Sequence, residues 1–369
     1  MLGLLLASLL QASSGLAQAP APAIWRLSPA PVLILGGPDA SGPTEFSNVY
    51  DATFWEGRLL LLDGATQTLR LFELPSGRHL RTFGHRGEGP GEFLNALHLQ
   101  PLPGDSLFVS DLQASRFTIF DPQGRIERVV SLAVSVPGSR LTPLGRFLDG
   151  SILAWAPRFT DAAGPGLHHI GATIYHVRPD GTHADSLRVL PFTTVQPMRV
   201  GPAQGWRVAL GAGQLFPAVT DRVAYFSSPT TYTVHTFDPQ AGTWGIIQAD
   251  SPPRLGGSAD AETRRNAAVR HGASPHFMAQ VSGVDTLPAL LRPFVSSNGW
   301  LWVAEAATDS ATRTRGLAIY TAAGQLQARL RVPSGLQILA VSDTYLVAKN
   351  WEPEAEELVY VYGITRSPR

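Results

Sequence analysis

A repeated order of residue types is the feature that most limits what this chain can fold into. Segments 59–81 and 107–128 each hold an apolar run ending in Asp, an alternating run ending in Phe nine residues later, and a Gly-containing turn before another alternating run. The same order returns near residues 174–181, 232–242 and 317–324. Alternating runs bounded by turn residues are typical of antiparallel strands. A unit of three or four strands that recurs at intervals of roughly 45 to 60 residues indicates propeller blades rather than a helical solenoid.

Six such units fit the sequence and predict an all-β, six-bladed β-propeller. We place the blades at residues 46–84, 93–131, 141–191, 206–249, 289–332 and 336–363. The sixth unit has only three evident strands, whereas an isolated apolar run, Val32-Leu33-Ile34-Leu35, precedes the first unit. We expect this N-terminal strand to close the ring as the outer strand of blade six, which would leave no long unpaired edge there. Residues 20–369 then form a single domain.

Residues 258–288 interrupt the repeat between blades four and five. The stretch 259–270 is rich in helix formers and follows Ser258, a suitable N-cap, so we expect a helical insertion here. Long insertions often serve as surface covers or binding loops. The sequence leaves open whether the helix packs on the outside of one blade or covers the channel mouth.

Composition restricts the compartment and the partners. The chain of 369 residues has 29 basic and 29 acidic residues, so its zero net charge argues against a nucleic-acid partner. It has no cysteine, which excludes disulfides, thiol nucleophiles and zinc–thiolate sites. Residues 1–19 combine an apolar run with Ala17-Gln18-Ala19 and resemble a signal peptide, too short for a permanent membrane span. We expect an exported, periplasmic or extracellular monomer.

Blades one and two carry a family resemblance. The segment Phe83–Phe93, the run Gly104–Asp111, and Arg116 ahead of Phe120-Asp121 resemble the six-bladed propellers of the NHL-repeat type from exported bacterial proteins. Residues 287–303 are similar to the start of a late blade in the same group. The resemblance implies the fold but little about activity, because propellers host many functions.

The loop Arg86-Gly87-Glu88-Gly89-Pro90-Gly91-Glu92 is the first candidate site. Its glycines could expose N–H groups to a phosphate, but the loop lacks the Gly-Lys-Ser/Thr ending and precedes a strand instead of a helix, so it is not a P-loop. Two interpretations remain. Either the loop is an inter-blade crossover pinned by Arg86 or Glu92, or Arg86, Glu88 and Glu92, with His98, face the channel and bind a polar ligand.

Metal binding is the second candidate chemistry. Asp63 and Asp111 occupy equivalent repeat positions, which favours a structural role in the turn that follows each strand. Related propellers, the lactonases and the peptidyl-hydroxyglycine lyases, hold an axial divalent ion, Ca or Zn, so the resemblance implies this alternative, but the sequence does not reproduce the acidic and amide ligands of the lactonases. His168, His169, His271 and His276, which lie in loops or at strand starts, are the candidate ligands. Their spacing matches no fixed metal motif.

The sequence shows no assembled acid, base or nucleophile. The leading hypothesis is therefore an exported scaffold that binds a protein, peptide or carbohydrate and needs no cofactor. The alternative is a metal-dependent hydrolase or lyase. The tryptophans, Trp155 and Trp244 among them, are expected to fill the wedges between blades, with a sugar-stacking platform as the other interpretation.

Overall fold

The computed structural model describes residues 21–366, apart from gaps at 135, 137–138, 160–163, 201–202, 211, 250–261, 263–264, 267–268, 270–273, 285–289, 310–311 and 351–356. The described part is all-β. It contains six sheets of four or five strands and one two-stranded sheet. No helix within these residues is long and apolar enough to cross a membrane. The predicted signal peptide, residues 1–19, lies outside the described residues.

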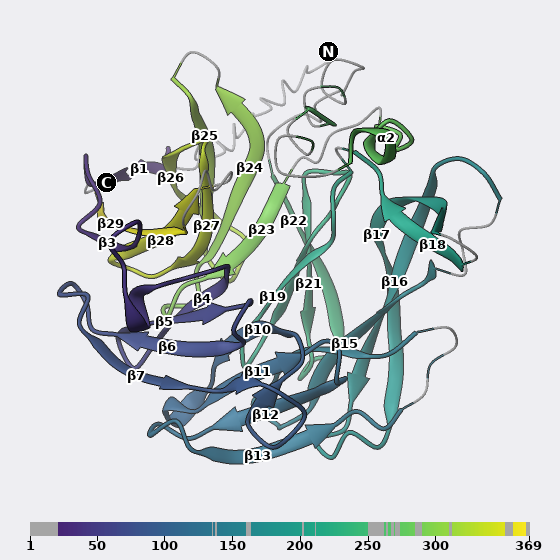
Figure 1. Ribbon diagram of the computed structural model, residues 1–369, viewed down its shortest axis with the longest axis horizontal. Coiled ribbons are helices and arrows are strands. Elements are labelled where there is room, and N and C mark those ends of the chain that lie inside the picture. The colour runs from purple at the N-terminus through teal and green to yellow at the C-terminus, as the bar shows by residue number, and fades with distance from the viewer. Residues whose placement is uncertain are drawn as a thin grey trace, which may run out of the picture.

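The six large sheets are the blades of a closed ring. Their first strands contact one another in cyclic order, and the first strand of the last blade contacts that of the first blade. In Figure 1 the colours follow this ring, so that the yellow blade six lies beside the purple strands of blade one. The predicted six-bladed β-propeller is confirmed.

Blades one to three are built from strands between β4 and β18. Blade one consists of β4 (Val49–Trp55), β5 (Arg58–Asp63), β6 (Thr68–Phe72) and β7 (His79–Phe83). Blade two consists of β10 (Ala96–Pro101), β11 (Leu107–Asp111), β12 (Arg116–Phe120) and β13 (Ile126–Ser131). Blade three consists of β14 (Thr142–Arg146), β15 (Ile152–Pro157), β16 (His168–Val177), β17 (Ala184–Val200) and β18 (Ala203–Val208).

Blades four to six complete the ring. Blade four consists of β19 (Phe216–Val219), β20 (Ala224–Ser227), β21 (Thr233–Asp238) and β22 (Thr243–Gln248). Blade five consists of β23 (Leu290–Val295), β24 (Leu301–Asp309), β25 (Thr314–Tyr320) and β26 (Leu326–Pro333). Blade six consists of β27 (Leu336–Val341), β28 (Tyr345–Asn350) and β29 (Leu358–Thr365).

Three N-terminal strands attach to the last two blades. These are β1 (Ala23–Ile24), β2 (Arg26–Leu27) and β3 (Leu33–Gly36). The strand β3 pairs antiparallel with β29 and becomes the outer strand of blade six, which confirms the predicted closure. The sequence pattern did not reveal the other two pairings: β2 adds to the far end of β29, and β1 pairs parallel with β26 of blade five.

The apolar runs are continuous because each blade packs against a neighbour on both faces. The run Leu59–Leu62 on β5 is fully buried. Leu59 and Leu61 pack with blade six, whereas Leu60 and Leu62 pack with blade two, as the alternation of side chains along a strand requires. One strand thus supplies two inter-blade cores.

The boundary between blades three and four differs from the prediction. Residues 206–208 were assigned to the start of blade four, but they belong to β18, a fifth strand that pairs antiparallel with the end of β17. Blade four begins only at β19. The error arose because the apolar alternation at Gly205–Val208 is equally suited to an outer strand and to the first strand of a new blade.

The predicted insertion at 258–288 lies largely outside the described residues, including most of its expected helix at 259–270. The described part includes the four-residue helix α2 (Pro275–Met278). Met278, at the end of α2, and Val281 pack against Met198 of β17, and Gln196 of the same strand accepts the Ser282 N–H at 2.8 Å. This part of the segment therefore packs on blade three (Figure 1).

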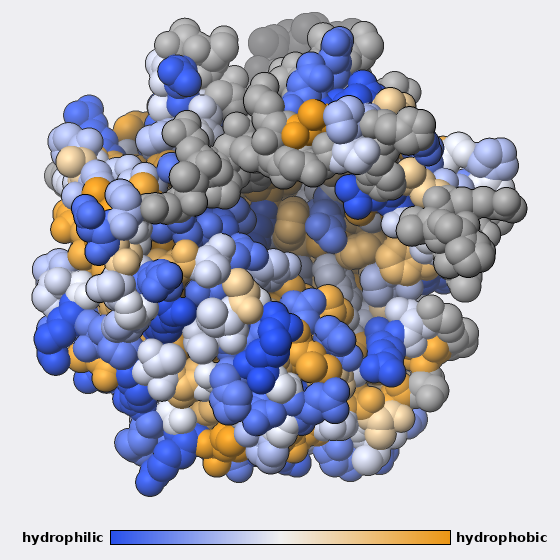
Figure 2. Space-filling view, in the orientation of Figure 1, coloured by the Kyte–Doolittle hydropathy of each residue, from blue (hydrophilic) through white to orange (hydrophobic). Residues whose placement is uncertain are grey.

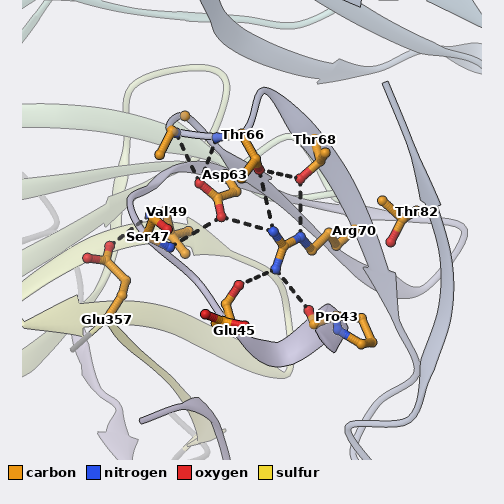
Figure 3. Close-up of polar contacts among 12 residues, drawn as sticks. Pro43, Glu45, Ser47, Val49, Asp63, Thr66, Thr68, Arg70, Thr82 and Glu357 are labelled. Carbon is orange, nitrogen blue, oxygen red and sulfur yellow. Dashed lines mark hydrogen bonds and ion pairs between the residues drawn. The ribbon is translucent and has the colours of Figure 1, made fainter. Parts of the chain in front are cut away.

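Asp63 and Arg70 hold the chain where it enters blade one (Figure 3). The buried Asp63 carboxylate accepts the N–H of Ala65 at 3.0 Å in the following turn and lies 3.1 Å from Nη2 of Arg70. The Arg70 guanidinium also donates to the carbonyls of Pro43 and Glu45, next to the short helix η1 (Gly42–Thr44). The structural role predicted for Asp63 is confirmed.

Asp111 and Arg116 repeat this arrangement in blade two. Asp111 accepts the N–H of Ala114 in its turn at 3.0 Å and that of Leu94 in the incoming crossover at 2.9 Å. Arg116 donates to the carbonyls of Glu88, Gly89 and Glu92 in the same crossover. The repeated Asp of the sequence motif therefore anchors each crossover to the blade that follows it.

Candidate functional site

The crossover loop 85–92 uses most of its polar groups internally. It contains β8 (His85–Arg86) and β9 (Glu92–Phe93), which pair parallel. Arg86 is exposed, and its Nη2 donates to the Ala65 carbonyl at 3.1 Å. Gly91 has a φ of +73° with Ile126 close by, so a side chain there would be strained. These contacts support the crossover interpretation.

Glu92 is the centre of that loop. Its Oε2 accepts the Gly89 N–H at 2.8 Å, and its Oε1 lies 2.9 Å from Nε2 of His85. The Gly89 N–H, and secondarily His85, hold the pKa of Glu92 below its ordinary value. Arg86, Glu88 and Glu92 are absent from the described residues that line the two axial cavities, whereas His98 lines both. The structure thus separates His98 from the three residues with which it was grouped.

An ion pair joins two blades that are not neighbours in the ring. Arg292 on β23 of blade five places Nη1 2.7 Å from Oδ1 of Asp51 on β4 of blade one. Asp51 is fully buried, and its other oxygen accepts the Leu99 N–H of β10 at 3.1 Å. One carboxylate therefore links the first strands of three blades.

His98 lies beside this pair on β10. Its Nε2 is buried and has no hydrogen-bond partner among the described residues. Burial, assisted by the charge of Arg292, lowers the pKa of His98 to about 3. The imidazole is therefore neutral at physiological pH, and its buried Nε2 lacks a partner among the described residues.

Two cavities meet at His98 and Arg292. The cavity at the beginnings of the inner strands, here called the start-side cavity, has a volume of about 390 Å³. Its wall combines aromatic side chains with amides, Tyr50 and basic groups. The wall includes Trp155, Phe216, Gln337, Arg315 and Lys349. Figure 2 shows a hollow in the face turned towards the viewer, and both hydrophobic and hydrophilic side chains surround it.

The second cavity lies at the ends of the same strands and is called the end-side cavity. Its volume is about 460 Å³, and it includes Thr53, Gln100, Asp221, Arg222 and Ser296 in its wall. Asp221 is a carboxylate in this wall, whereas no acidic side chain stands among the described residues of the start-side wall. The two cavities therefore differ in charge.

The basic groups of the start-side cavity are backed by carboxylates outside its wall. Lys349, the only lysine of the chain, lies 2.6 Å from Oε1 of Glu357, which also accepts the Val49 N–H. Glu357 is buried, as is Asp51 behind Arg292. Burial lowers the pKa of the third basic group, Arg315. Burial, together with the charge of Asp51, raises the pKa of Tyr50, which stays a hydrogen-bond donor.

The candidate metal ligands do not form a described site. His168 and His169 lie at the start of β16, the third strand of blade three, with ring nitrogens near Gly164 O at 3.0 Å and Thr194 Oγ1 at 2.8 Å. His271 lies outside the described residues, and His276 belongs to α2, where only the backbone is described. No group of three His, Asp or Glu side chains in the described ranges could hold a metal ion.

The residues near the axis also do not fit an axial divalent ion. Asp51 is the buried carboxylate there, and its oxygens are engaged by the Arg292 guanidinium and by N–H groups of Ala52 and Leu99. A guanidinium repels a divalent cation at this distance. The chemistry available at the axis is recognition by hydrogen-bond donors, cations and aromatic surfaces.

Sequence reasoning found His98 but missed Asp51, Arg292 and Lys349. Charged residues inside apolar strands are rarely buried without a partner, so Asp51 within Val49–Trp55 and Arg292 within Leu290–Val295 carried a usable signal. Their partnership could not be found, because they are far apart in the sequence.

Comparisons with known proteins show the fold alone. No protein-family model matches the chain, and no curated protein matches it in sequence. A member of the DUF4221 family from Bacteroides vulgatus is structurally similar, with a TM-score of 0.55 at 10% identity, over 94% of this chain and 100% of that one. A protein from Bacteroides fragilis named as a putative exported protein has a TM-score of 0.52 at 13% identity, over 94% and 96%. Each match spans 94% of this chain, and neither supports the NHL type in particular.

Proposed function

We propose that this protein is an exported, non-catalytic ligand-binding propeller of the NHL-repeat-like group, and that its ligand occupies the start-side cavity. The observation that carries the proposal is His98, a residue that lines that cavity and whose buried Nε2 has no hydrogen-bond partner among the described residues. A buried polar atom without a partner costs about 1–3 kcal/mol, so a native structure keeps one mainly where a ligand or water completes it. Export rests on the signal-peptide pattern of residues 1–19.

The cavity has the general properties of a small-molecule site. Its volume of about 390 Å³ falls within the roughly 300–1,000 Å³ typical of ligand pockets. Trp155, Phe216 and Phe294 supply an apolar surface, while a few polar groups converge on the axis. These dimensions favour a small ligand, or one residue of a peptide or carbohydrate, over a large protein surface.

A blocked cavity tests the proposal. We would screen the mature protein by ligand-observed NMR with a general fragment library and repeat the screen on Gln337→Trp, which fills the start-side cavity from β27. The matched control is Gln240→Trp, at an exposed position of the outer hairpin of blade four. We expect a set of fragments to bind the wild type and the control but not Gln337→Trp. Fragments that still bind to Gln337→Trp, or a wild-type protein that binds no fragment, would contradict the proposal.

A further inference from the structure

The start-side cavity has an ordered distribution of charge. Arg292, Arg315 and Lys349 stand in its wall, and the described part of that wall includes no carboxylate. The carboxylates of Asp51 and Glu357 bind two of these cations from outside the wall. The positive end of each pair thus faces the cavity and the negative end lies in the protein. A ligand in the cavity meets the positive ends first.

The neutral groups of the wall add hydrogen-bond donors. Tyr50 is a phenol whose pKa is raised, mainly by burial, so it can donate. Gln337 contributes an amide, and His98 contributes a ring nitrogen, Nε2, that has no partner in the described residues and donates in the Nε2–H tautomer. Donors that surround a partly dry space stabilise a negative charge more than they would in water, because the local dielectric constant is low.

From this arrangement we infer that the ligand carries a carboxylate on an apolar body, with the carboxylate directed at His98 and Arg292. The inference rests on the proposed function. A guanidinium keeps several N–H donors beyond the one used by Asp51, so Arg292 can bind a second carboxylate. A monoanion fits better than a dianionic phosphate because carboxylates already offset Arg292 and Lys349. Trp155 and Phe216 provide the surface for the apolar body.

Matched probes separate charge from shape. We would titrate 3-phenylpropionate and 2-naphthylacetate against the corresponding amides, 3-phenylpropionamide and 2-naphthylacetamide, and against phenyl phosphate. Each acid has nearly the shape of its amide but carries one negative charge. We expect each acid to bind at least about tenfold more tightly than its amide, because hydrogen bonds to an ionised group are roughly twice as strong as those to a neutral one.

Variants of the wall residues test which side chains bind the carboxylate of the ligand. His98→Leu should weaken binding of the acids by about tenfold and leave the amides nearly unchanged, and His98→Gln, which restores a donor, should recover part of the loss. The double variant Lys349→Met/Glu357→Gln removes the cation and its partner together and should weaken the acids several-fold. The control Arg78→Gln removes an exposed cation of blade one and should change nothing.

Each outcome decides between the two proposals. Acids that bind more tightly than amides, and lose this preference in His98→Leu while the variant keeps its circular dichroism spectrum, support the inference. Equal binding of acids and amides, tighter binding of phenyl phosphate, or failure of all five probes while neutral library fragments still bind would overturn the carboxylate inference alone. Failure of the five probes together with an empty fragment screen would overturn the proposed function as well.

Discussion

Nη1 of Arg292 lies 2.7 Å from Oδ1 of Asp51, so a side chain of blade five binds a side chain of blade one. Blade six stands between these two blades in the circle of first strands. The pair therefore links blade five to blade one. This link exists in addition to the pairing of β3 with β29, which completes the sheet of blade six. The pair also directs the guanidinium towards His98 and both axial cavities.

Breaking this pair should destabilise the protein. Asp51→Asn leaves the guanidinium in a largely dry wall without its counter-charge, which we expect to lower the free energy of unfolding by about 3 kcal/mol. The matched control is Asp221→Asn, whose ion pair is long, 4.0 Å, and made with an Arg222 side chain that is 74% exposed; its effect should stay within about 0.5 kcal/mol. Chemical denaturation measures both variants. Equal effects would show that the axial pair contributes nothing special.

His98 should make the stability depend on pH between about 3 and 6.5. Burial, and secondarily Arg292, lowers the pKa of His98 to about 3 in the folded chain. In this interval the unfolded chain binds one proton more, so the free energy of unfolding rises with pH, by up to about 1.4 kcal/mol per unit, and levels off above 6.5. Carboxylates titrate in part of the same range, so the measured quantity is the difference between wild type and His98→Gln. Parallel pH profiles for the two proteins would disprove the assignment.

The sequence was sufficient to predict the ring of blades but not to predict which residues form the candidate site. Alternation and turn residues are local signals, so the blades and the closing strand at 33–36 could be predicted. The pairing of β1 with β26 could not, because a two-residue strand carries no pattern. The contact between Asp51 and Arg292 depends on how the blades converge in space, which no local pattern records. His98 was singled out because it lies near the start of a predicted strand, where a side chain can reach the axis, and its burial came from the structure.

The closing strand offers a test with an internal control. On β3, Leu35 is 4% exposed and packs with blades one and six, whereas its neighbour Ile34 is 51% exposed. We expect Leu35→Ala to cost about 2–4 kcal/mol, because it leaves a cavity in the core that joins the first and last blades. Ile34→Ala should change stability by no more than about 0.5 kcal/mol. The free energy of unfolding is measured by urea denaturation. Similar decreases for both variants would mean that β3 stabilises the ring through its hydrogen bonds with β29 and not through core packing.

Removal of divalent ions should leave the fold and the ligand site unchanged. The carboxylate nearest the axis is bound by Arg292, and no described group of three acidic or histidine side chains could hold an ion. We expect the melting temperature and the affinity for 3-phenylpropionate to be the same before and after dialysis against EDTA. A stoichiometric calcium or zinc ion in the purified protein, with a lower melting temperature after its removal, would favour the metal-dependent hydrolase or lyase instead.

Arg116 distinguishes a structural crossover from a binding loop. Its guanidinium donates to the carbonyls of Glu88, Gly89 and Glu92, and only 13% of its side chain is exposed. Arg116→Gln leaves these carbonyls short of donors, so we expect a loss of about 2 kcal/mol in stability with unchanged affinity for 3-phenylpropionate. Arg125→Gln, which removes an arginine whose side chain is 75% exposed in the next hairpin, should cost at most about 0.5 kcal/mol. A variant of Arg116 that kept its stability but lost the probe would move the ligand from the axis to the loop at 85–92, because the Arg116 contacts would then serve recognition and not the fold.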